Sequence, residues 1–494
     1  ENSRVWSCPA GSGEWGRIGA PTPLRVGPRR DRHRLEMGGR RFWLDVESGA
    51  VHELDEVAWD VLVAAEEVAG PLGGMVAAEA VVERLAGRHP AGEIRDALAD
   101  LAALAAAGML FPDPEPVSAT APVEMVAPVG APALQPALKN LTLHMVHGCN
   151  LRCHYCLAGD GSYGAHGRMD ADTARRAVDM LIASPEQDQT LEFSGGEPLL
   201  HFPLIQETTL YAAEQAPAAG KRLRFLLSTN GTLLDSERVA FLAEHRFRVV
   251  VSLDGRPATH DGMRPRVGGQ GSYAESLAGA RLLAAALAEQ DLCLRTVFTR
   301  QNLDFASDVL HLADMGFRTL TLESVVADPA EPYALQAEDL SLVRGEYRKL
   351  TAALAERWRR GEGIRFLPFR LDPDEPFTTE HYSRGCGSGF TSLTVTPQGE
   401  IYPCHQFVGR PGYRTGRVET GIDQPALLQR FAAAGLSAKV GCADCWARYF
   451  CGGGCHANGD RVHGDILRPD ELECELRKYR LECAFWLAGE TAAA

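Results

Sequence analysis

Three cysteines in a short loop are the first residues of this chain whose types and spacing could do chemistry. Cys149, Cys153 and Cys156 form a CxxxCxxC pattern directly after an apolar run. Four cysteines would saturate a cubane 4Fe-4S cluster, so a tight loop of three predicts an iron that also binds another molecule. A zinc loop is the alternative for this pattern taken alone.

Glycine-rich or polar steps follow the next three predicted strands. In order they are Ser194-Gly-Gly-Glu-Pro198, Ser228-Thr-Asn-Gly231 and Ser252-Leu-Asp-Gly255. Glycine permits close backbone approach to a ligand, a carboxylate such as Glu197 can pair with an ammonium group, and hydroxyl and amide groups suit a ribose. A loop after the first strand of a βα barrel lies where active sites form, so we expect the steps and the cysteine loop to meet there.

A second group of cysteines lies near the C-terminal end. It comprises Cys386, Cys404, Cys442, Cys445, Cys451, Cys455, Cys474 and Cys483. An odd, clustered set among 13 cysteines predicts metal binding rather than disulfides in a cytosolic chain. Zinc also suits the CxxC and CxxxC spacings within the group. Cys8 and Cys293 stand apart and are expected to be spare or buried thiols.

Strand-like and helical runs alternate around the first cysteine loop. We expect strands at 141–146, 190–193, 224–227, 248–253, 293–299 and 319–322. We expect helices at 171–183, 203–215, 235–244, 274–288 and 304–315, with helical spacing again at 338–360. This alternation predicts an α/β fold in which a parallel sheet is wrapped by helices, and six βα units fit a partial (β/α)6 TIM barrel.

The N-terminal part has a different pattern. Two short apolar runs at 41–46 and 49–54 predict a β-hairpin. Helical periodicity near 55–67, 76–87 and 91–107 completes a small winged-helix-like module, placed at 31–112. Residues 1–30 are predicted to be a flexible tail, and the proline- and alanine-rich stretch 113–139 a linker.

Composition and charge exclude some classes of protein. Among 494 residues, 50 Lys and Arg face 65 Asp and Glu, which gives a net charge of −15. This charge opposes binding to nucleic acid through phosphate neutralisation. No apolar run reaches the length of a membrane span, and the N-terminus lacks the order of a signal peptide, so we expect a cytoplasmic protein without membrane partners.

The CxxxCxYC loop and the GGEP, STNG and SLDG steps resemble, in order, the motifs of the radical SAM superfamily. The resemblance implies that Cys149, Cys153 and Cys156 ligate a 4Fe-4S cluster that binds S-adenosylmethionine (SAM). It also implies a set of SAM-binding residues: Tyr155 near the adenine, Gly195, Gly196 and Glu197 at the methionine amino group, and Ser228, Asn230 and Ser252 at the ribose or carboxylate. His260, Asp261 and Arg264 either face the substrate or lie in a solvated loop.

The second cysteine group resembles the SPASM domain of peptide-modifying radical SAM enzymes, at 381–486. A radical SAM barrel at 140–345 and a connecting helix at 346–380 would precede it. The resemblance implies two auxiliary 4Fe-4S clusters, hence three in all. One would be held by Cys442, Cys445, Cys451 and Cys474, and the other by Cys386, Cys404 and Cys455. Either Cys483 completes the second cluster, or its fourth iron stays open for a substrate thiolate.

The N-terminal module resembles the PqqD-like RiPP recognition element, which captures a peptide. An exposed hairpin edge can accept an extended segment as an added strand. A winged-helix DNA binder is the alternative, and the acidic net charge opposes it. The implied partners are a cysteine-containing precursor peptide or small enzyme subunit, bound through this module, and an external electron donor such as flavodoxin or ferredoxin.

His405 directly follows Cys404, where anaerobic sulfatase maturases carry an Asp that acts as base. His405 is therefore the candidate catalytic base, and formylglycine formation is less expected.

Segments at 44–52, 323–326 and 403–409 resemble thioether-forming maturases, namely those of ranthipeptides and of quinohemoprotein amine dehydrogenase. The expected reaction joins a cysteine sulfur to a carbon of another residue, such as an Asp or Glu side chain. The alternatives are a maturase that makes carbon–carbon crosslinks or oxidises a side chain, and a non-enzymatic iron–sulfur scaffold or electron carrier.

Overall fold

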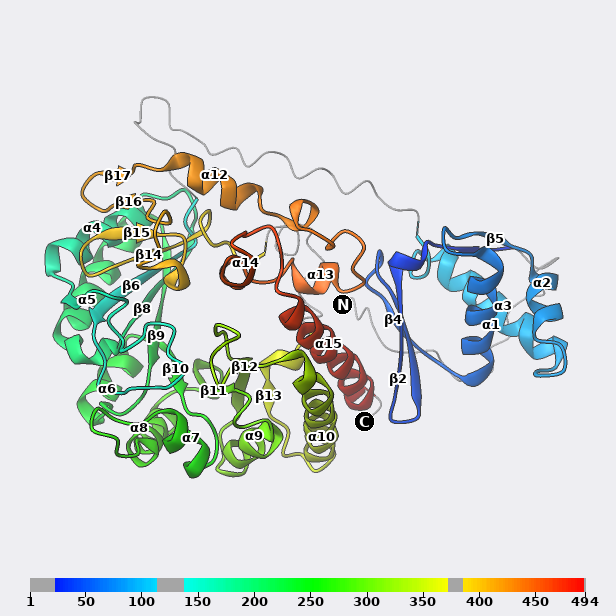
Figure 1. Cartoon of the computed structure of the whole chain (residues 1–494), viewed down its shortest axis with the longest axis horizontal. Helices are drawn as coiled ribbons and strands as arrows, with labels where there is room; N and C mark the ends of the chain where they lie inside the picture. Colours follow the sequence, from blue (N-terminus) through cyan, green and yellow to red (C-terminus); the bar gives the residue numbers. More distant parts are fainter. Residues whose placement is uncertain (1–22, 113–136, 372–384, 493–494) are drawn as a thin grey trace.

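The computed structural model describes residues 23–112, 137–371 and 385–492, which form three parts along the chain (Figure 1). A small N-terminal module is drawn in blue, a large α/β part in cyan to yellow-green, and a cysteine-rich region in orange and red. Most of the predicted linker, at 113–136, lies outside the described residues, as do 372–384.

The N-terminal module contains two small sheets and three helices. Its elements are β1 (Leu24–Val26), β2 (Arg32–Met37), β3 (Arg40–Asp45), β4 (Val51–Leu54), α1 (Glu56–Ala69), β5 (Gly74–Val76), α2 (Ala78–Arg84) and α3 (Ala91–Ala106). Strands β2, β3 and β4 form an antiparallel sheet in that order. The predicted hairpin and three helices are thus confirmed.

The prediction of a flexible tail over residues 1–30 is wrong for its last part. Residues 24–26 form β1, which pairs antiparallel with β5 and buries Leu24 and Val26. The partner strand is far away in sequence, so the short run carries no local pattern that would reveal it. Residues 1–22, and Cys8 with them, lie outside the described residues.

The α/β part contains all six strands that the alternation predicted. They are β6 (Asn140–His147), β8 (Asp188–Gly195), β9 (Arg222–Thr229), β10 (Arg248–Ser252), β11 (Leu292–Phe298) and β12 (Thr319–Ser324). Neighbouring strands in this series are parallel. A short strand, β7 (Gly167–Arg168), pairs antiparallel with β6.

The expected helices also form. They are α4 (Ala171–Ile182), α5 (Phe202–Ala218), α6 (Ser236–Glu244), α8 (Tyr273–Ala286), α9 (Phe305–Asp314) and α10 (Leu340–Arg359). Asp170 and Asp235 cap α4 and α6, because each carboxylate accepts a backbone N–H at 2.8 Å. An additional short helix, α7 (Pro257–Met263), follows the SLDG step and was not predicted.

The sheet extends beyond the six predicted strands on both sides. β13 (Arg365–Phe366) adds parallel to β12, and β14 (Ser392–Val395) adds parallel to β6. β13 lies within the stretch 346–380 that was predicted as a connecting helix. That prediction is wrong from Arg360 onward within the described residues, because α10 ends at Arg359.

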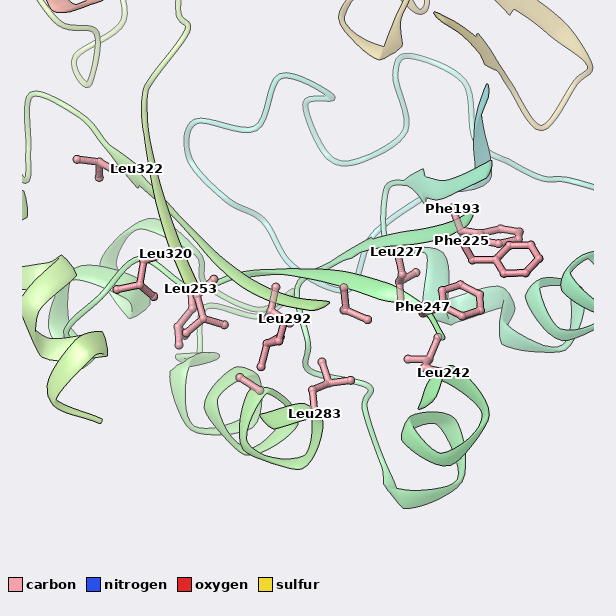
Figure 2. Close-up of a cluster of buried hydrophobic side chains, with 14 of the residues drawn as sticks. Phe193, Phe225, Leu227, Leu242, Phe247, Leu253, Leu283, Leu292, Leu320 and Leu322 are labelled. Carbon is pink, nitrogen blue, oxygen red and sulfur yellow. The ribbon is translucent and has the colours of Figure 1, made fainter. Parts of the chain in front are cut away.

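Apolar side chains between the sheet and its helices hold the strand ends in place. Figure 2 shows Phe193, Phe225 and Phe247 gathered at one end of this core. The Phe193 and Phe225 rings both stack on the Phe247 ring, with centroids 5.8 and 5.2 Å away. Such offset aromatic pairs add to the stability gained by burial. They fix β8 and β9 relative to β10, so the steps that follow these strands lie side by side.

The cysteine-rich region combines short strands with helices. It contains β14, β15 (Glu400–Tyr402), β16 (Gly416–Arg417), β17 (Gly421–Ile422), α12 (Pro425–Ala433), α13 (Arg448–Cys451), α14 (His456–His463) and α15 (Glu471–Ala492). The four strands continue the main sheet from its β6 edge. Its helices α13, α14 and α15 lie between the α/β part and the N-terminal module (Figure 1).

The N-terminal module packs directly on the cysteine-rich region. The His33 ring stacks on Trp446 with centroids 3.7 Å apart, and Arg448 pairs with Asp31 at 2.6 Å and with Glu47. An apolar cluster beneath these contacts combines side chains of β2, β3 and α15 with Cys445 and its neighbours. None of the helices in the described ranges has the length and apolar character needed to cross a membrane.

Candidate functional site

The first cysteine loop begins directly after β6. Its three thiols are free and partly buried. Cys149 Sγ accepts the backbone N–H of Leu151 at 3.4 Å and the side-chain amide of Asn230 at 3.7 Å. Burial raises the pKa of Cys149 to about 12 and that of Cys153 to about 11. The thiols therefore keep their protons until a metal displaces them.

The segment after α7 closes over this loop. The backbone N–H groups of Arg152 and His154 donate to the carbonyls of Pro265 and Met263, at 2.7 and 2.9 Å. Arg264 Nη1 donates to the Tyr155 hydroxyl at 2.8 Å. The cysteine loop is thus held by a part of the chain about 110 residues further on.

Partly buried Tyr155 contacts two buried charged residues, Asp254 and Arg264. The Tyr155 hydroxyl donates to Asp254, and the Arg264 guanidinium lies 5.7 Å from the centre of the Tyr155 ring. Burial raises the pKa of both Tyr155 and Asp254. Sequence reasoning placed Tyr155 at the site but missed its partners, because the contacts join positions 99 and 109 residues apart.

The solvated-loop interpretation of His260 and Arg264 is excluded, because both residues are buried. Ser272 Oγ donates to the Arg264 carbonyl at 2.6 Å, so His260 Nε2 donates to Ser272 at 2.9 Å. His260 Nδ1 then accepts the Asp254 N–H at 3.2 Å. His260 therefore fixes the turn that carries Asp254 and Arg264.

The GGEP step packs too tightly against the cysteine loop for any residue but glycine. A Cβ on Gly196 would lie 2.1 Å from the Gly148 carbonyl oxygen. Gly195 has φ 120°, where a Cβ would lie 2.6 Å from the Val146 oxygen. These glycines bring the backbone after β8 against the start of the cysteine loop, as the sequence predicted.

Glu197 is buried and connects two of the predicted steps. Its carboxylate accepts from Thr229 Oγ1 at 2.7 Å, Asn230 N at 2.8 Å and Leu199 N at 3.0 Å. Burial raises the pKa of this carboxyl, whereas these hydrogen bonds lower it. A carboxylate has about four acceptor sites, so about one remains for a ligand ammonium group.

The other predicted SAM-binding residues lie at neighbouring strand ends. The Asn230 amide donates to Asn150 in the cysteine loop at 2.9 Å. Ser228 donates to Glu192 at 2.8 Å, and Ser252 accepts from Arg295 at 3.1 Å. The structure therefore brings Asn230 to the cysteine loop, whereas Ser228 and Ser252 contact charged groups of the barrel strands.

The donor set at this end of the sheet fits a 4Fe-4S cluster with SAM. Three thiols, a glycine cradle and a buried carboxylate with a spare acceptor site converge there. Across the described ranges, no group of three or more His, Cys, Asp or Glu side chains is arranged for one metal ion. A cubane cluster spreads its thiolates over several irons, so this finding concerns single ions.

The second cysteine group divides into the two sets that were expected. Burial, together with the nearby sulfurs of Cys455 and Cys386, raises the pKa of Cys404 to about 12. Burial raises the pKa of Cys474 to about 12 as well, and there the contributing sulfurs belong to Cys451, Cys442 and Cys445. The sulfurs in each set are therefore near one another, and their role as ligands stays a prediction.

Cys483 lies apart from both sets. It is 3% exposed on α15 and belongs to the main apolar core. Burial raises the pKa of its thiol to about 11, and the groups that act on it are Thr351, Glu482 and Arg348. Cys293 also stands alone, on β11, where burial raises its pKa to about 11.

The three-cysteine set lies toward the interior that the sheet encloses. His405, next to Cys404, is solvent-exposed, and Glu192, Arg295 and Glu323 of β8, β11 and β12 act on its charge. Desolvation by the surrounding protein lowers the pKa of the His405 imidazole. Burial raises the pKa of the Tyr163 phenol, and the nearby sulfurs of Cys156 and Cys404 also raise it. This ring therefore lies between the first cysteine loop and the three-cysteine set.

Two histidines of β6 complete this interior, and sequence reasoning missed them. The rings of His144 and His147 pack against Tyr163 with centroids 4.7 and 4.9 Å away. His147 Nδ1 donates to the Ala165 carbonyl, so its Nε2 accepts from His144 Nδ1 at 3.1 Å. His144 Nε2 is then an acceptor, buried without a partner among the described residues. The two histidines are three positions apart, which regular alternation would place on opposite faces of β6. A register shift between His144 and Val146 brings them together, and no local sequence pattern signals it.

Known proteins with similar sequences share this part of the chain. The model of the Radical SAM superfamily matches residues 143–305. The PqqA peptide cyclase of Ruegeria pomeroyi is 30% identical over 276 residues, which cover 55% of this chain and 68% of the relative. The cysteine-type anaerobic sulfatase-maturating enzyme of Clostridium novyi is 24% identical over 328 residues, which cover 63% of this chain and 85% of the relative.

A solved structure has the same fold. It is native anSMEcpe with bound AdoMet and the Cp18Cys peptide, with a TM-score of 0.60 and 20% identity. The match covers 72% of this chain and 99% of that one.

Proposed function

The chain belongs to the radical SAM superfamily, and from this membership we propose that it is a peptide or protein maturase that forms thioether crosslinks. It would join a cysteine sulfur to a carbon of another residue within a peptide or small enzyme subunit. The observation that carries the proposal is a set of three cysteines, Cys386, Cys404 and Cys455, that faces the barrel interior while Cys483 lies elsewhere.

The first cysteine loop would hold the catalytic cluster and SAM. When bound, they supply a 5′-deoxyadenosyl radical, which removes a hydrogen atom from an unactivated carbon. Cys149, Cys153 and Cys156 would ligate the cluster, and the spare acceptor site of Glu197 would take the methionine ammonium. The contacts of Tyr155 with Asp254 and Arg264 would hold this end of the loop in place.

The two auxiliary sets would hold one cluster each. Four cysteines saturate one of them, whereas three leave an iron of the other without a protein ligand. A metal lowers the pKa of a thiol that binds it, so this place would take a substrate cysteine as thiolate. The set lies across Tyr163 from the first cysteine loop, which would bring substrate sulfur and target carbon into one interior.

Crosslinking must remove one hydrogen from carbon and one from sulfur. The carbon gives up a hydrogen atom to the deoxyadenosyl radical, and the sulfur gives up a proton. The one further electron released as the bond forms would pass to the oxidised auxiliary cluster that the three-cysteine set would hold. His405 is the proposed proton acceptor, because it is open to solvent and lies near Glu192, Arg295 and Glu323 in the same interior. An external donor such as flavodoxin or ferredoxin would reduce the first cluster.

The N-terminal module would capture the substrate. In the sheet order β2-β3-β4, the two outer strands have one free edge each. β2 contributes His33, which stacks on Trp446, so its side of the sheet is taken by the cysteine-rich region. β4 is the strand to which an extended peptide segment would add. The relatives named for a peptide cyclase and the peptide-bound solved structure support a peptide substrate.

The product of the reaction tests this function. The reconstituted chain would be incubated without oxygen with SAM, dithionite and the cysteine-containing peptide encoded beside its gene. We expect 5′-deoxyadenosine and a peptide that has lost two hydrogen atoms and one thiol reactive with iodoacetamide. A loss of two hydrogens with every thiol still reactive would indicate a carbon–carbon crosslink or side-chain oxidation. If no deoxyadenosine forms, the chain is a scaffold or electron carrier.

A further inference from the structure

Lys439 is a buried lysine in the cysteine-rich region. It is 3% exposed, and its Nζ donates to the carbonyl oxygens of Gly453 at 2.7 Å and Gly454 at 3.2 Å. The charged neighbours that act most strongly on it are cysteine sulfurs, not carboxylates. A buried ammonium group is unfavourable unless an anion offsets its lost hydration. The position therefore requires a negative charge that is not an Asp or Glu.

The loop that receives Lys439 has an unusual backbone. Gly452, Gly453 and Gly454 all adopt left-handed conformations, with φ of 68°, 87° and 70°. Successive residues keep this conformation at little cost only when they are glycines. A Cβ on Gly453 would lie 2.9 Å from Lys439 Cδ, so loop and lysine fit closely. The glycines thus direct two carbonyls toward one ammonium group.

The same loop connects the two auxiliary sets. It runs from Cys451 in the four-cysteine set to Cys455 in the three-cysteine set. The Lys439 carbonyl accepts the N–H of Cys442 at 3.3 Å. The ammonium group of Lys439 has sulfurs of both sets as neighbours, those of Cys442, Cys455, Cys386 and Cys451. As metal-bound thiolates these sulfurs would supply the negative charge that the position requires.

We propose that Lys439 is a positioning residue that holds a positive charge between the two auxiliary sets and raises the reduction potentials of both clusters. The inference rests on the proposed function, which supplies those clusters. A thiolate-bound 4Fe-4S cluster is an anion, and reduction adds one more negative charge. A fixed cation nearby stabilises the reduced form more than the oxidised form. Because one lysine lies beside both sets, the two potentials shift together.

Redox titration of the reconstituted full chain, followed by electron paramagnetic resonance (EPR), tests the inference. Lys439→Gln keeps an N–H donor for the two carbonyls but removes the charge, and Lys439→Arg keeps the charge. The matched control is Lys221→Met, because Lys221 Nζ also donates to two carbonyls, those of Ser184 and Glu186, just before β9 begins. That end of the sheet is opposite to the cysteine loop.

In Lys439→Gln we expect the ratio of reduced to oxidised cluster, measured at one fixed solution potential, to fall about tenfold for both auxiliary clusters. This change corresponds to a reduction potential lower by ~59 mV for one electron. The first cluster should be unchanged, and Lys439→Arg and Lys221→Met should match the unmodified chain. If Lys439→Gln fails to hold iron while Lys439→Arg holds it with native potentials, the charge is required and the inference stands. Unchanged potentials in Lys439→Gln, or loss of iron in both variants, would overturn it. If the unmodified chain binds no auxiliary clusters, the proposed function fails too.

Discussion

Gly196 is the residue whose substitution the structure tolerates least at the candidate site. Its missing Cβ would lie 2.1 Å from the Gly148 oxygen, and backbone on both sides leaves no flexible side chain to move away. A methyl group here would push the GGEP step away from the cysteine loop.

Gly196→Ala is therefore expected to lower deoxyadenosine formation from SAM by at least about tenfold, the effect of a loss of ~1.4 kcal/mol in positioning. High-performance liquid chromatography of the products measures this rate. Gly345→Ala is the control: Gly345 lies in α10 with no atom within 4 Å of its Cβ position, so alanine should leave the rate unchanged. Equal rates for the two variants would contradict a role for the glycine cradle.

The buried thiols make a prediction about the pH dependence of the iron-free chain. Burial raises the pKa of Cys404 from 9.0 to about 12. Above pH 9 the unfolded chain loses this proton while the folded chain keeps it, so stability falls as pH rises. The slope for such a thiol is about 1.4 kcal/mol per pH unit.

Urea unfolding at pH 8 and pH 10 measures this dependence, and Cys404→Ser should show a smaller fall than the unmodified iron-free chain. A fall of the same size in both proteins would show that the buried thiol does not contribute. The CxxxCxxC loop was predictable from its local spacing, whereas the two auxiliary sets were expected only from the resemblance to the SPASM domain, because Cys386 and Cys455 are far apart in sequence. The Tyr155, Asp254 and Arg264 contacts were not, because they depend on the register of the closing segment.

Helix α13 connects two parts of the molecule through Arg448. This side chain is 5% exposed and pairs with Asp31 at 2.6 Å and with Glu47. Truncating a largely buried partner leaves the opposite charges without compensation. The helix therefore fixes the N-terminal module to the cysteine-rich region.

Arg448→Ala is expected to lower the free energy of unfolding by about 2–4 kcal/mol, seen as an earlier urea midpoint by circular dichroism. Arg30→Ala is the matched control, because Arg30 pairs with the exposed Asp444 in the same interface at 3.3 Å. An exposed pair of this kind contributes about 0–1 kcal/mol. Similar midpoints for the two variants would mean that Arg448 is not essential to the interface.

At the scale of elements, periodicity explains what could be predicted. The six barrel strands and their helices have clear apolar patterns, and all of them form. The missed elements are short: β1 has 3 residues and β13 has 2. Each is defined by pairing with a strand from elsewhere, which leaves no local pattern. The helix predicted over 346–380 failed because α10 ends at Arg359 and β13 joins the sheet instead.

At the scale of the whole molecule, the cysteine groups lie along one path. The first loop faces the barrel interior, the three-cysteine set lies across Tyr163, and the four-cysteine set extends to the apolar cluster that holds the N-terminal module. The resemblance to the SPASM domain implied the sets, and the fold places His405, next to Cys404, near Glu192, Arg295 and Glu323 of the sheet. This order places the site proposed for substrate sulfur next to the site proposed for the radical.

The proposed open iron depends on the remoteness of Cys483, and iron analysis of Cys483→Ala tests it most directly. We expect Cys483→Ala, reconstituted without oxygen, still to hold about twelve irons per chain, as three 4Fe-4S clusters require. Cys404→Ala should lose the iron of one auxiliary cluster, which confirms that the assay detects a missing ligand. If Cys483→Ala instead loses the iron and the EPR signal of an auxiliary cluster, the open iron is contradicted. Cys483 would then be the fourth ligand beside Cys386, Cys404 and Cys455.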